Sequence, residues 1–341
     1  MSAILAPAII HQPQSIDAAL SLLTHEQPYS TEEPDRNSYI GGSSAAVILG
    51  VSKWQSPVAL WSIMTGRTQR ETEADMKHAR RRRLLAGKRW EATVFEMLHE
   101  SLRYDGHEVE LVCGNRRYID REHSFLRAEI DFEILLDGVP TNVEIKTVDV
   151  RVANQWGETG TDSIPLHYAA QVMHGLGVRP TRRCVVGALF GVDNLGAYVV
   201  ERDAETIEAI RAKEARFWNV NILQDIPPDP IDFADVTTLF PKDVGTSIEA
   251  DGAIADAVAD LRDVKEQIKA LEADESRLKL RVGQFLGENT SLVYDGRQIA
   301  SWKSQNTRRL DTERLKIDAP DIYQSFIKTG ASRVLRLITE R

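Results

Sequence analysis

Three charged residues stand in two neighbouring stretches whose pattern predicts β-strands. In TNVEIKTVDV, residues 141–150, Glu144 and Lys146 are two positions apart and share one face, because successive side chains of a strand alternate between its faces. In LRAEIDFEILLDG, residues 126–138, apolar side chains occupy alternate positions and Asp131 points away from them. Charged side chains are depleted from buried strands unless they are paired or functional. The two stretches therefore predict either a half-exposed hairpin with cross-strand ion pairs or a chemical site.

The turn between the two predicted strands decides whether these side chains meet. If Asp137–Pro140 forms the turn with a two-residue loop, Asp131 lies opposite Lys146 and Glu133 lies opposite Glu144. Directly opposed residues project to the same side of a sheet, so the Asp131 carboxylate is expected to converge with Glu144 and Lys146. A shift by one residue would turn Asp131 to the other face and remove the cluster.

Two carboxylates beside a lysine are suited to the hydrolysis of a phosphodiester with the help of a metal ion. Hard divalent cations bind carboxylate and carbonyl oxygens and water, and a bound cation lowers the pKa of its water. The candidate ligands are Asp131, Glu144 and the carbonyl of Ile145, with Mg²⁺ as the expected cofactor and Mn²⁺ as a substitute. Lys146 would orient or deprotonate the attacking water and balance the local negative charge.

An acid-x-Lys triplet is weak support when it stands alone. A second triplet of the same form, Asp263-Val264-Lys265, lies in a helical pattern where it predicts only a solvated face. The case for a site therefore depends on what surrounds Glu144 and Lys146.

Composition describes an ordinary globular protein with no apolar run long enough to cross a membrane. The 341 residues are 42% hydrophobic and 27% charged, and the chain does not start with the charged segment of a signal peptide. Cys113 and Cys184 are the only cysteines, and no Cys/His cluster accompanies them. This usage argues against a zinc site or a four-cysteine iron–sulfur cluster and predicts a reduced, cytoplasmic setting.

The net charge of −9 is concentrated in one part of the chain. Residues 201–294 carry 20 acidic and 11 basic side chains, so the rest of the chain sums to zero. One segment is strongly basic, with Lys77, Arg80, Arg81, Arg82, Arg83, Lys88 and Arg89. Such a local patch matters more for phosphate binding than the total charge does. It is either a solvated helix face or the wall of a DNA channel.

The elements around these residues predict an α/β core followed by a different module. Helical patterns at 56–66, 76–102 and 165–177 alternate with strand patterns. This alternation indicates an α/β domain over 36–225 after an N-terminal extension over 1–35. A linker is expected over 226–250. Residues 251–341 then predict an α+β module, with one long amphipathic helix and a β-hairpin around an Asp-Gly turn. The apolar residues of that helix, at 254, 258, 261, 264, 268, 271, 278, 282 and 285, are typical of a helical hairpin or short coiled coil.

Five motifs follow one another across residues 36–200. They are RNSYIGGSSAAVILG, GKRWEATVFEML, AEIDF, VEIK and IPLHYAAQVMHGLGV. In this order they resemble the YqaJ-like viral recombinases, the branch of the PD-(D/E)xK nuclease superfamily that includes phage lambda exonuclease. The resemblance implies a PD-(D/E)xK restriction-endonuclease-like core, in which helices flank a mixed central sheet.

The resemblance also implies roles for residues that the strand pattern does not reach. Arg36 and Ser43, seven positions apart, would bind the substrate phosphate, with Ser44 beside them. Glu91 would add an acid to the metal site, and Gln171 would act on the attacking water. Two positions depart from the family pattern, because Ser44 stands where many relatives carry an acid and Ile130 replaces the proline of the PD motif.

Each of these residues also has a purely structural interpretation. Glu91 would pair with Arg82 or Lys88 on its own helix, and the two serines would only cap a helix. Gln171 would be a plain helix residue. The tryptophans at 54, 61 and 156 are expected in the core, and the histidines at 167 and 174 are expected to be structural rather than metal ligands.

The function implied by the family is a Mg²⁺-dependent DNA nuclease that digests one strand of double-stranded DNA from its 5′ end. In that family a closed ring of subunits passes the 3′ overhang to a single-strand annealing protein, which implies a homo-oligomer encoded by a phage or prophage in a bacterial host cell. One alternative is an endonuclease or end-trimming nuclease in recombination or defence. The other is a catalytically silent DNA-binding or assembly protein.

Overall fold

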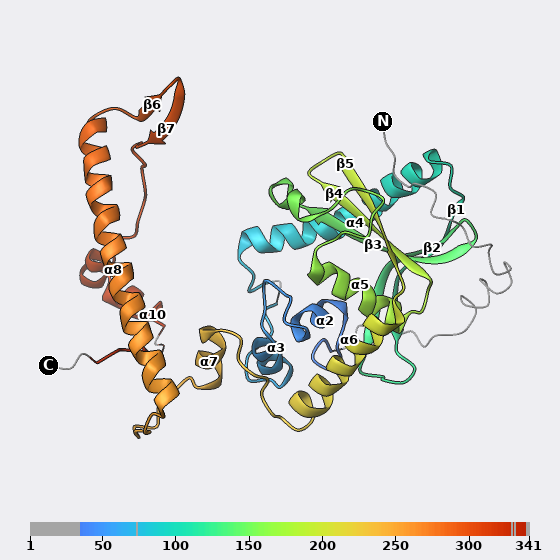
Figure 1. Ribbon diagram of the computed structural model, residues 1–341, viewed down its shortest axis with the longest axis horizontal. Helices are drawn as coiled ribbons and strands as arrows, with labels where there is room; N and C mark the ends of the chain where they lie inside the picture. Colours follow the sequence, from blue (N-terminus) through green and yellow to red (C-terminus); the bar gives the residue numbers. More distant parts are fainter. Residues whose placement is uncertain (1–34, 73, 329, 331, 339–341) are drawn as a thin grey trace. The chain divides into compact units, whose positions relative to one another are not determined.

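The computed structural model describes residues 35–338 except 73, 329 and 331, and the chain separates into two compact units that meet in sequence at Leu239 and Phe240 (Figure 1). The predicted extension over residues 1–35 lies outside the described part, apart from its last residue. No helix among the described residues is both long and apolar enough to span a membrane.

The first unit is built on a five-stranded sheet in sequence order (Figure 1). Its strands are β1 (Val109–Ile119), β2 (Arg127–Leu136), β3 (Val139–Val148), β4 (Arg183–Phe190) and β5 (Asn194–Glu201). Neighbouring strands are antiparallel except β3 and β4, which are parallel and are joined through α5 (Leu166–Val178). The mixed α/β architecture expected from the sequence is therefore present.

The hairpin between β2 and β3 has a register two residues away from the predicted one. Leu136 pairs with Val139, so the loop is Asp137-Gly138 rather than the predicted Gly138-Val139. Both loop residues have positive φ, +53° and +74°, as a type I′ turn requires. Glu133 consequently faces Asn142, not Glu144. A shift by an even number of residues leaves every side chain on its predicted face.

The two faces of β3 receive different helices. Val143 and Ile145 pack against α4 (His78–Tyr104), whose buried side chains all come from its second half, Val94 onward. The opposite face, which carries Glu144 and Lys146, turns towards α5, because Gln171 of that helix donates to Glu144. The charged residues thus lie between a sheet and a helix rather than on a solvated surface.

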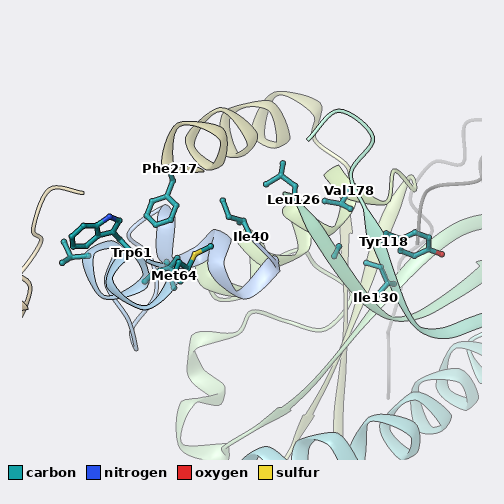
Figure 2. Packing of buried hydrophobic residues seen from close by; sticks show 12 residues of the cluster. Ile40, Trp61, Met64, Tyr118, Leu126, Ile130, Val178 and Phe217 are labelled. Atoms are coloured by element: carbon teal, nitrogen blue, oxygen red, sulfur yellow. The ribbon is translucent and has the colours of Figure 1, made fainter. Parts of the chain in front are cut away.

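A separate apolar cluster holds the N-terminal helices against the edge of β2 (Figure 2). It includes Ile40, Trp61, Leu126 and Phe217, and Ile40 forms a single parallel bridge with Leu126. The elements around it are α2 (Gly42–Ile48), α3 (Pro57–Met64), α6 (Ala204–Arg216) and the π-helical Phe217–Ile222. This packing fixes the segment before α2 beside the sheet. The short helical segment Val150–Gln155 instead packs Ala153 against a different apolar cluster.

The stretch predicted as a linker contains α7 (Phe233–Leu239), which contacts α3. Asp235 of α7 is buried, accepts a hydrogen bond from Ser56 and accepts another from the Ile231 backbone N–H at 3.0 Å. These contacts explain why residues 233–239 adopt a helix and belong to the first unit.

The second unit consists of α8 (Gly252–Leu286), β6 (Ser291–Tyr294), β7 (Arg297–Ser301), α9 (Thr312–Asp318) and α10 (Pro320–Ser325). The two strands pair around Asp295-Gly296, both with positive φ. Within the described residues of this unit, Leu286 is the single buried hydrophobic side chain. The predicted helix and hairpin are present, but the unit has almost no core of its own.

Candidate active site

The site forms where the regular hydrogen-bonded pairing of β2 and β3 ends. Regular pairing of these strands begins at Phe132 and Val143 and runs towards the turn. On the far side of that pair, the Asp131 carboxylate takes the place of a strand partner, because its Oδ2 accepts a hydrogen bond from the Ile145 backbone N–H at 2.8 Å. Asp131 is therefore held against the backbone between Glu144 and Lys146. The predicted convergence of the three residues is present, although the predicted pairing of Asp131 with Lys146 is wrong.

Glu144 is the centre of the polar contacts on this face. Lys146 forms an ion pair with its Oε1, and Gln171 Nε2 donates to the same oxygen at 2.6 Å. The Lys146 ammonium also lies 5.2 Å from the centre of the Tyr168 ring. Two segments distant in sequence, β3 and α5, thus place their functional groups on one carboxylate.

Burial and close neighbours change the pKa values of Asp131 and Lys146. Burial, together with the neighbouring Glu144 carboxylate, raises the pKa of Asp131 to about 8. Burial alone would lower the pKa of Lys146, but the carboxylates of Glu144 and Asp131 outweigh it and raise that pKa above its usual value. Lys146 is therefore an ammonium that donates hydrogen bonds, and Asp131 is poorly stabilised as an anion.

The raised pKa of Asp131 predicts that Asp131→Asn stabilises the protein at alkaline pH. The folded state binds the Asp131 proton more tightly than the unfolded chain does, so the stabilisation is fully present below about pH 4 and is lost as pH rises through about 8. Asparagine removes this loss. In urea unfolding followed by tryptophan fluorescence, the variant should gain on the order of 3 kcal/mol over the wild type at pH 9 and much less at pH 5. An equal difference at both pH values would contradict the assignment.

A second polar cluster lies before and within the first turn of α2. Arg36 Nη2 donates to Ser43 Oγ at 3.1 Å and to Ser44 Oγ at 3.0 Å, while its guanidinium stacks 4.6 Å from the Tyr39 ring centre. Burial lowers the pKa of Arg36. The interpretation of the serines as helix caps is wrong, because Gly41 is the N-cap and no side chain caps this helix. Arg36 and both serines form one cluster, as predicted.

Both clusters line one cavity of about 460 Å³. Its lining includes Arg36, Ser43, Asp131, Glu144 and Gln171. Helix α2 approaches α5 closely here, since a Cβ on Gly42 would lie 2.8 Å from Cγ of Gln171. The cavity is large enough for a phosphate group and part of its nucleotide.

Glu91 of α4 lies on the wall of the same cavity. Burial and the charge of Glu129 raise the pKa of Glu91, whereas Lys146 and Lys88 act in the opposite direction. The charge of Glu144 also raises the pKa of Glu91, so the two carboxylates are within electrostatic range of each other. The basic residues Arg80–Arg83, on the same helix, are exposed.

The carboxylate oxygens at this cavity are the kind of ligand that a hard divalent cation prefers, but they do not form a complete coordination shell. No group of three or more Asp, Glu, His or Cys side chains in the described part of the chain is close enough together to hold a metal ion. Asp131 and Glu144 nevertheless place two carboxylates at one cavity, where burial and then the charge of Glu144 raise the pKa of Asp131. A divalent cation would stabilise both carboxylates as anions. The Ile145 side chain lies in the apolar core, so only its backbone can contribute.

Comparison with protein-family models shows which family this part of the chain resembles. The model of the YqaJ-like viral recombinase domain matches residues 33–182. The match identifies a YqaJ-like viral recombinase domain in this part of the chain. Every site residue predicted above, from Arg36 to Gln171, lies inside the matched YqaJ-like domain.

Individual relatives extend the similarity along the chain. The uncharacterized protein YqaJ of Bacillus subtilis (strain 168) is 28% identical over 309 residues, which cover 86% of this chain and 89% of that protein. Among solved structures, an alkaline exonuclease from Laribacter hongkongensis is 15% identical, with a TM-score of 0.39, and covers 54% of this chain and 88% of its own. The same enzyme in complex with dAMP gives a TM-score of 0.38, again at 15% identity and with the same coverage.

Sequence reasoning overlooked a buried ion pair behind the site of the YqaJ-like domain. Arg179 donates to Glu133 Oε2 from Nε at 3.0 Å and from Nη2 at 2.9 Å, and Tyr118 donates to the other oxygen of Glu133. Glu133 lies on the same face of β2 as Asp131, and a charged residue on that face predicts a charged partner. Arg179 gave no such signal, because a single arginine after a helix is usually exposed.

The aromatic and histidine residues divide between core and surface. Trp61 and Trp156 are buried as expected, but Trp54 is 73% exposed and lies edge-on to His167. His174 is buried, with Nδ1 2.7 Å from Glu214 Oε1 and Nε2 2.8 Å from the Arg127 carbonyl. Its contacts tie α5 to α6 and β2, which is the structural role expected for it.

Proposed function

We propose that the YqaJ-like domain is a deoxyribonuclease that requires a divalent cation, Mg²⁺ or Mn²⁺, and digests one strand of double-stranded DNA from its 5′ end. The observation that carries the proposal is the meeting of two polar clusters in one cavity. One cluster, around Arg36, has the donors that bind a phosphate, and the other, around Asp131 and Glu144, has the acids that bind a cation.

Arg36 and the serines would hold the substrate phosphate. A guanidinium with two hydroxyl groups offers donors in a planar arrangement that suits phosphate oxygens. Burial of Arg36 strengthens this interaction, since its charge has little competing water. Ser43 is the more accessible hydroxyl and would contact the phosphate first, while buried Ser44 would orient the guanidinium.

Asp131, Glu144 and the Ile145 carbonyl would hold the cation, with Glu91 as an additional acid on the cavity wall. The bound cation would lower the pKa of a water molecule and neutralise charge on the phosphate. Lys146, kept protonated by its two acidic neighbours, would stabilise the developing negative charge. Gln171 already donates to Glu144 and would orient that carboxylate and the attacking water.

Digestion from an end is supported by the family to which the domain belongs. The resemblance to the lambda-exonuclease branch further implies a ring of subunits and the transfer of the 3′ overhang to a single-strand annealing protein, which we include in the proposal. The runner-up function, an endonuclease or end-trimming enzyme, would use the same residues on internal phosphates.

The decisive experiment is a gel assay with end-labelled duplexes, run with Mg²⁺ and with EDTA. Linear duplex with a 5′-phosphate, the same duplex with a 5′-hydroxyl and a closed circle should be digested in that decreasing order, and the circle should remain intact. Cutting of the closed circle would favour the endonuclease. Binding without cleavage of any substrate would favour the catalytically silent protein.

A further inference from the structure

Helix α8 carries a seven-residue repeat whose apolar face is largely exposed within the described part of the second unit. Starting at Ile254, the first and fourth positions of successive heptads are Ile254 and Ala257, Leu261 and Val264, Ile268 and Leu271, Glu275 and Leu278, and Val282 and Phe285. Such a repeat is the sequence signature of a coiled coil. Most of these side chains are exposed, Phe285 to 77% and Leu271 to 67%.

The described part of the second unit covers little of this face, and among the large apolar residues of the repeat only Leu261 is half-buried. Leu286 is its single buried hydrophobic side chain, and the hairpin adds more exposed apolar groups, Val293, Ile299 and Trp302. An apolar face of this length on a protein surface marks an association site. A two-stranded coiled coil would bury it completely, because each side chain of the repeat would enter a gap on the facing helix.

We infer that α8 pairs with α8 of a second copy of this chain, in antiparallel orientation. Glu275, the acid in the repeat, decides the orientation. In a parallel pair, Glu275 would face the same glutamate of the second copy and two carboxylates would be buried together. In an antiparallel pair centred between Ile268 and Leu271, Glu275 faces Val264 of the second copy instead.

The other pairs of facing residues in the antiparallel arrangement are apolar. Ile268 meets Leu271 of the second copy at the centre, and Ile254 meets Phe285 near each end. Val282 meets the small Ala257. Each of these layers thus contains only apolar side chains, which can fill the core of the pair.

Charges beside the apolar face agree with this orientation. Asp260 would lie near Arg281 of the second copy, and Lys265 would lie near Glu272 of the second copy. Both are pairs of opposite charge, and symmetry repeats each of them. Glu275 itself forms an ion pair with Lys279 of its own helix at 2.7 Å.

The first test is the mass of the full chain in solution, measured by analytical ultracentrifugation. The double variant Ile268→Glu/Leu271→Glu should halve the mass of the wild-type assembly, because it places charges in the central layer. Leu278→Glu should weaken the assembly at least tenfold. The matched control is Leu280→Glu, because Leu280 is as exposed as Leu278 (61% and 51%) but lies on the opposite face of the repeat. A monomeric wild type, or a mass unchanged by the double variant, would overturn the proposal.

The second test distinguishes the two orientations by disulfide formation. Chains carrying Val264→Cys and chains carrying Glu275→Cys are mixed, allowed to exchange and oxidised. The antiparallel pair gives a cross-linked dimer only in the mixture, because residue 264 of one copy lies about 16 Å along the axis from residue 264 of the other. A cross-link in either variant alone indicates the parallel pair and overturns the orientation. The wild-type chain is the control, since Cys184 is buried and the pKa of Cys113 is raised to about 11.

Discussion

Replacing Lys146 by alanine, or Asp131 by asparagine, is expected to slow the digestion of linear duplex DNA on the order of 10³-fold or more. The first substitution removes the ammonium that lies between two carboxylates. The second keeps the size of the side chain and its contact with the Ile145 N–H but removes a charge that would bind the cation. Rates of release of labelled nucleotide at saturating Mg²⁺ measure the effect.

The chain provides matched controls for both substitutions on α8. Asp263→Asn and Lys269→Ala change the same residue types on an exposed helix face and should leave the rate within about twofold. Unfolding of each variant followed by tryptophan fluorescence shows whether the fold is retained. A variant at Asp131 or Lys146 that digests DNA at the wild-type rate would remove that residue from the site.

Glu133→Gln is expected to destabilise the YqaJ-like domain by about 3–5 kcal/mol, because it removes the carboxylate charge that faces the buried Arg179 guanidinium. The Glu133 and Arg179 side chains are only 1% and 4% exposed, and Tyr118 depends on the same carboxylate. Urea unfolding at neutral pH measures the difference in free energy of unfolding.

The control for Glu133 stands on the same strand and the same face. Glu129 forms an ion pair with Arg117 at 3.5 Å, but its side chain is 53% exposed. Glu129→Gln should therefore cost less than about 1 kcal/mol. Equal losses for the two variants would mean that burial of the Glu133–Arg179 pair does not determine its contribution.

Strand patterns predicted which faces the charged residues occupy, but not their partners. Alternation of apolar and polar residues is insensitive to a shift by two residues, so it placed Asp131 beside Glu144 and Lys146 while missing the register. The turn could have corrected this, because Asp137-Gly138 is the dipeptide that tolerates two successive positive φ angles.

Contacts between distant segments were beyond the reach of local patterns. Nothing near Arg179 or Glu214 in the sequence indicates that each is buried against a partner from another element. Likewise, the contact between Asp235 of α7 and Ser56 joins residues far apart in the chain, so the sequence pattern near α7 does not predict its helix. The motif order supplied the positions of Arg36 and Gln171, which periodicity alone could not.

Gly42 has no functional group, yet it links the two halves of the candidate site. Its backbone belongs to the helix that begins beside Arg36, and the space that its missing side chain leaves is filled by Gln171, the residue that holds Glu144. A larger residue at position 42 would push on Gln171 while leaving Arg36 and both serines in place. With the roles proposed for these residues, a substitution at Gly42 is therefore expected to slow turnover through Gln171 and to leave phosphate binding by Arg36 unchanged.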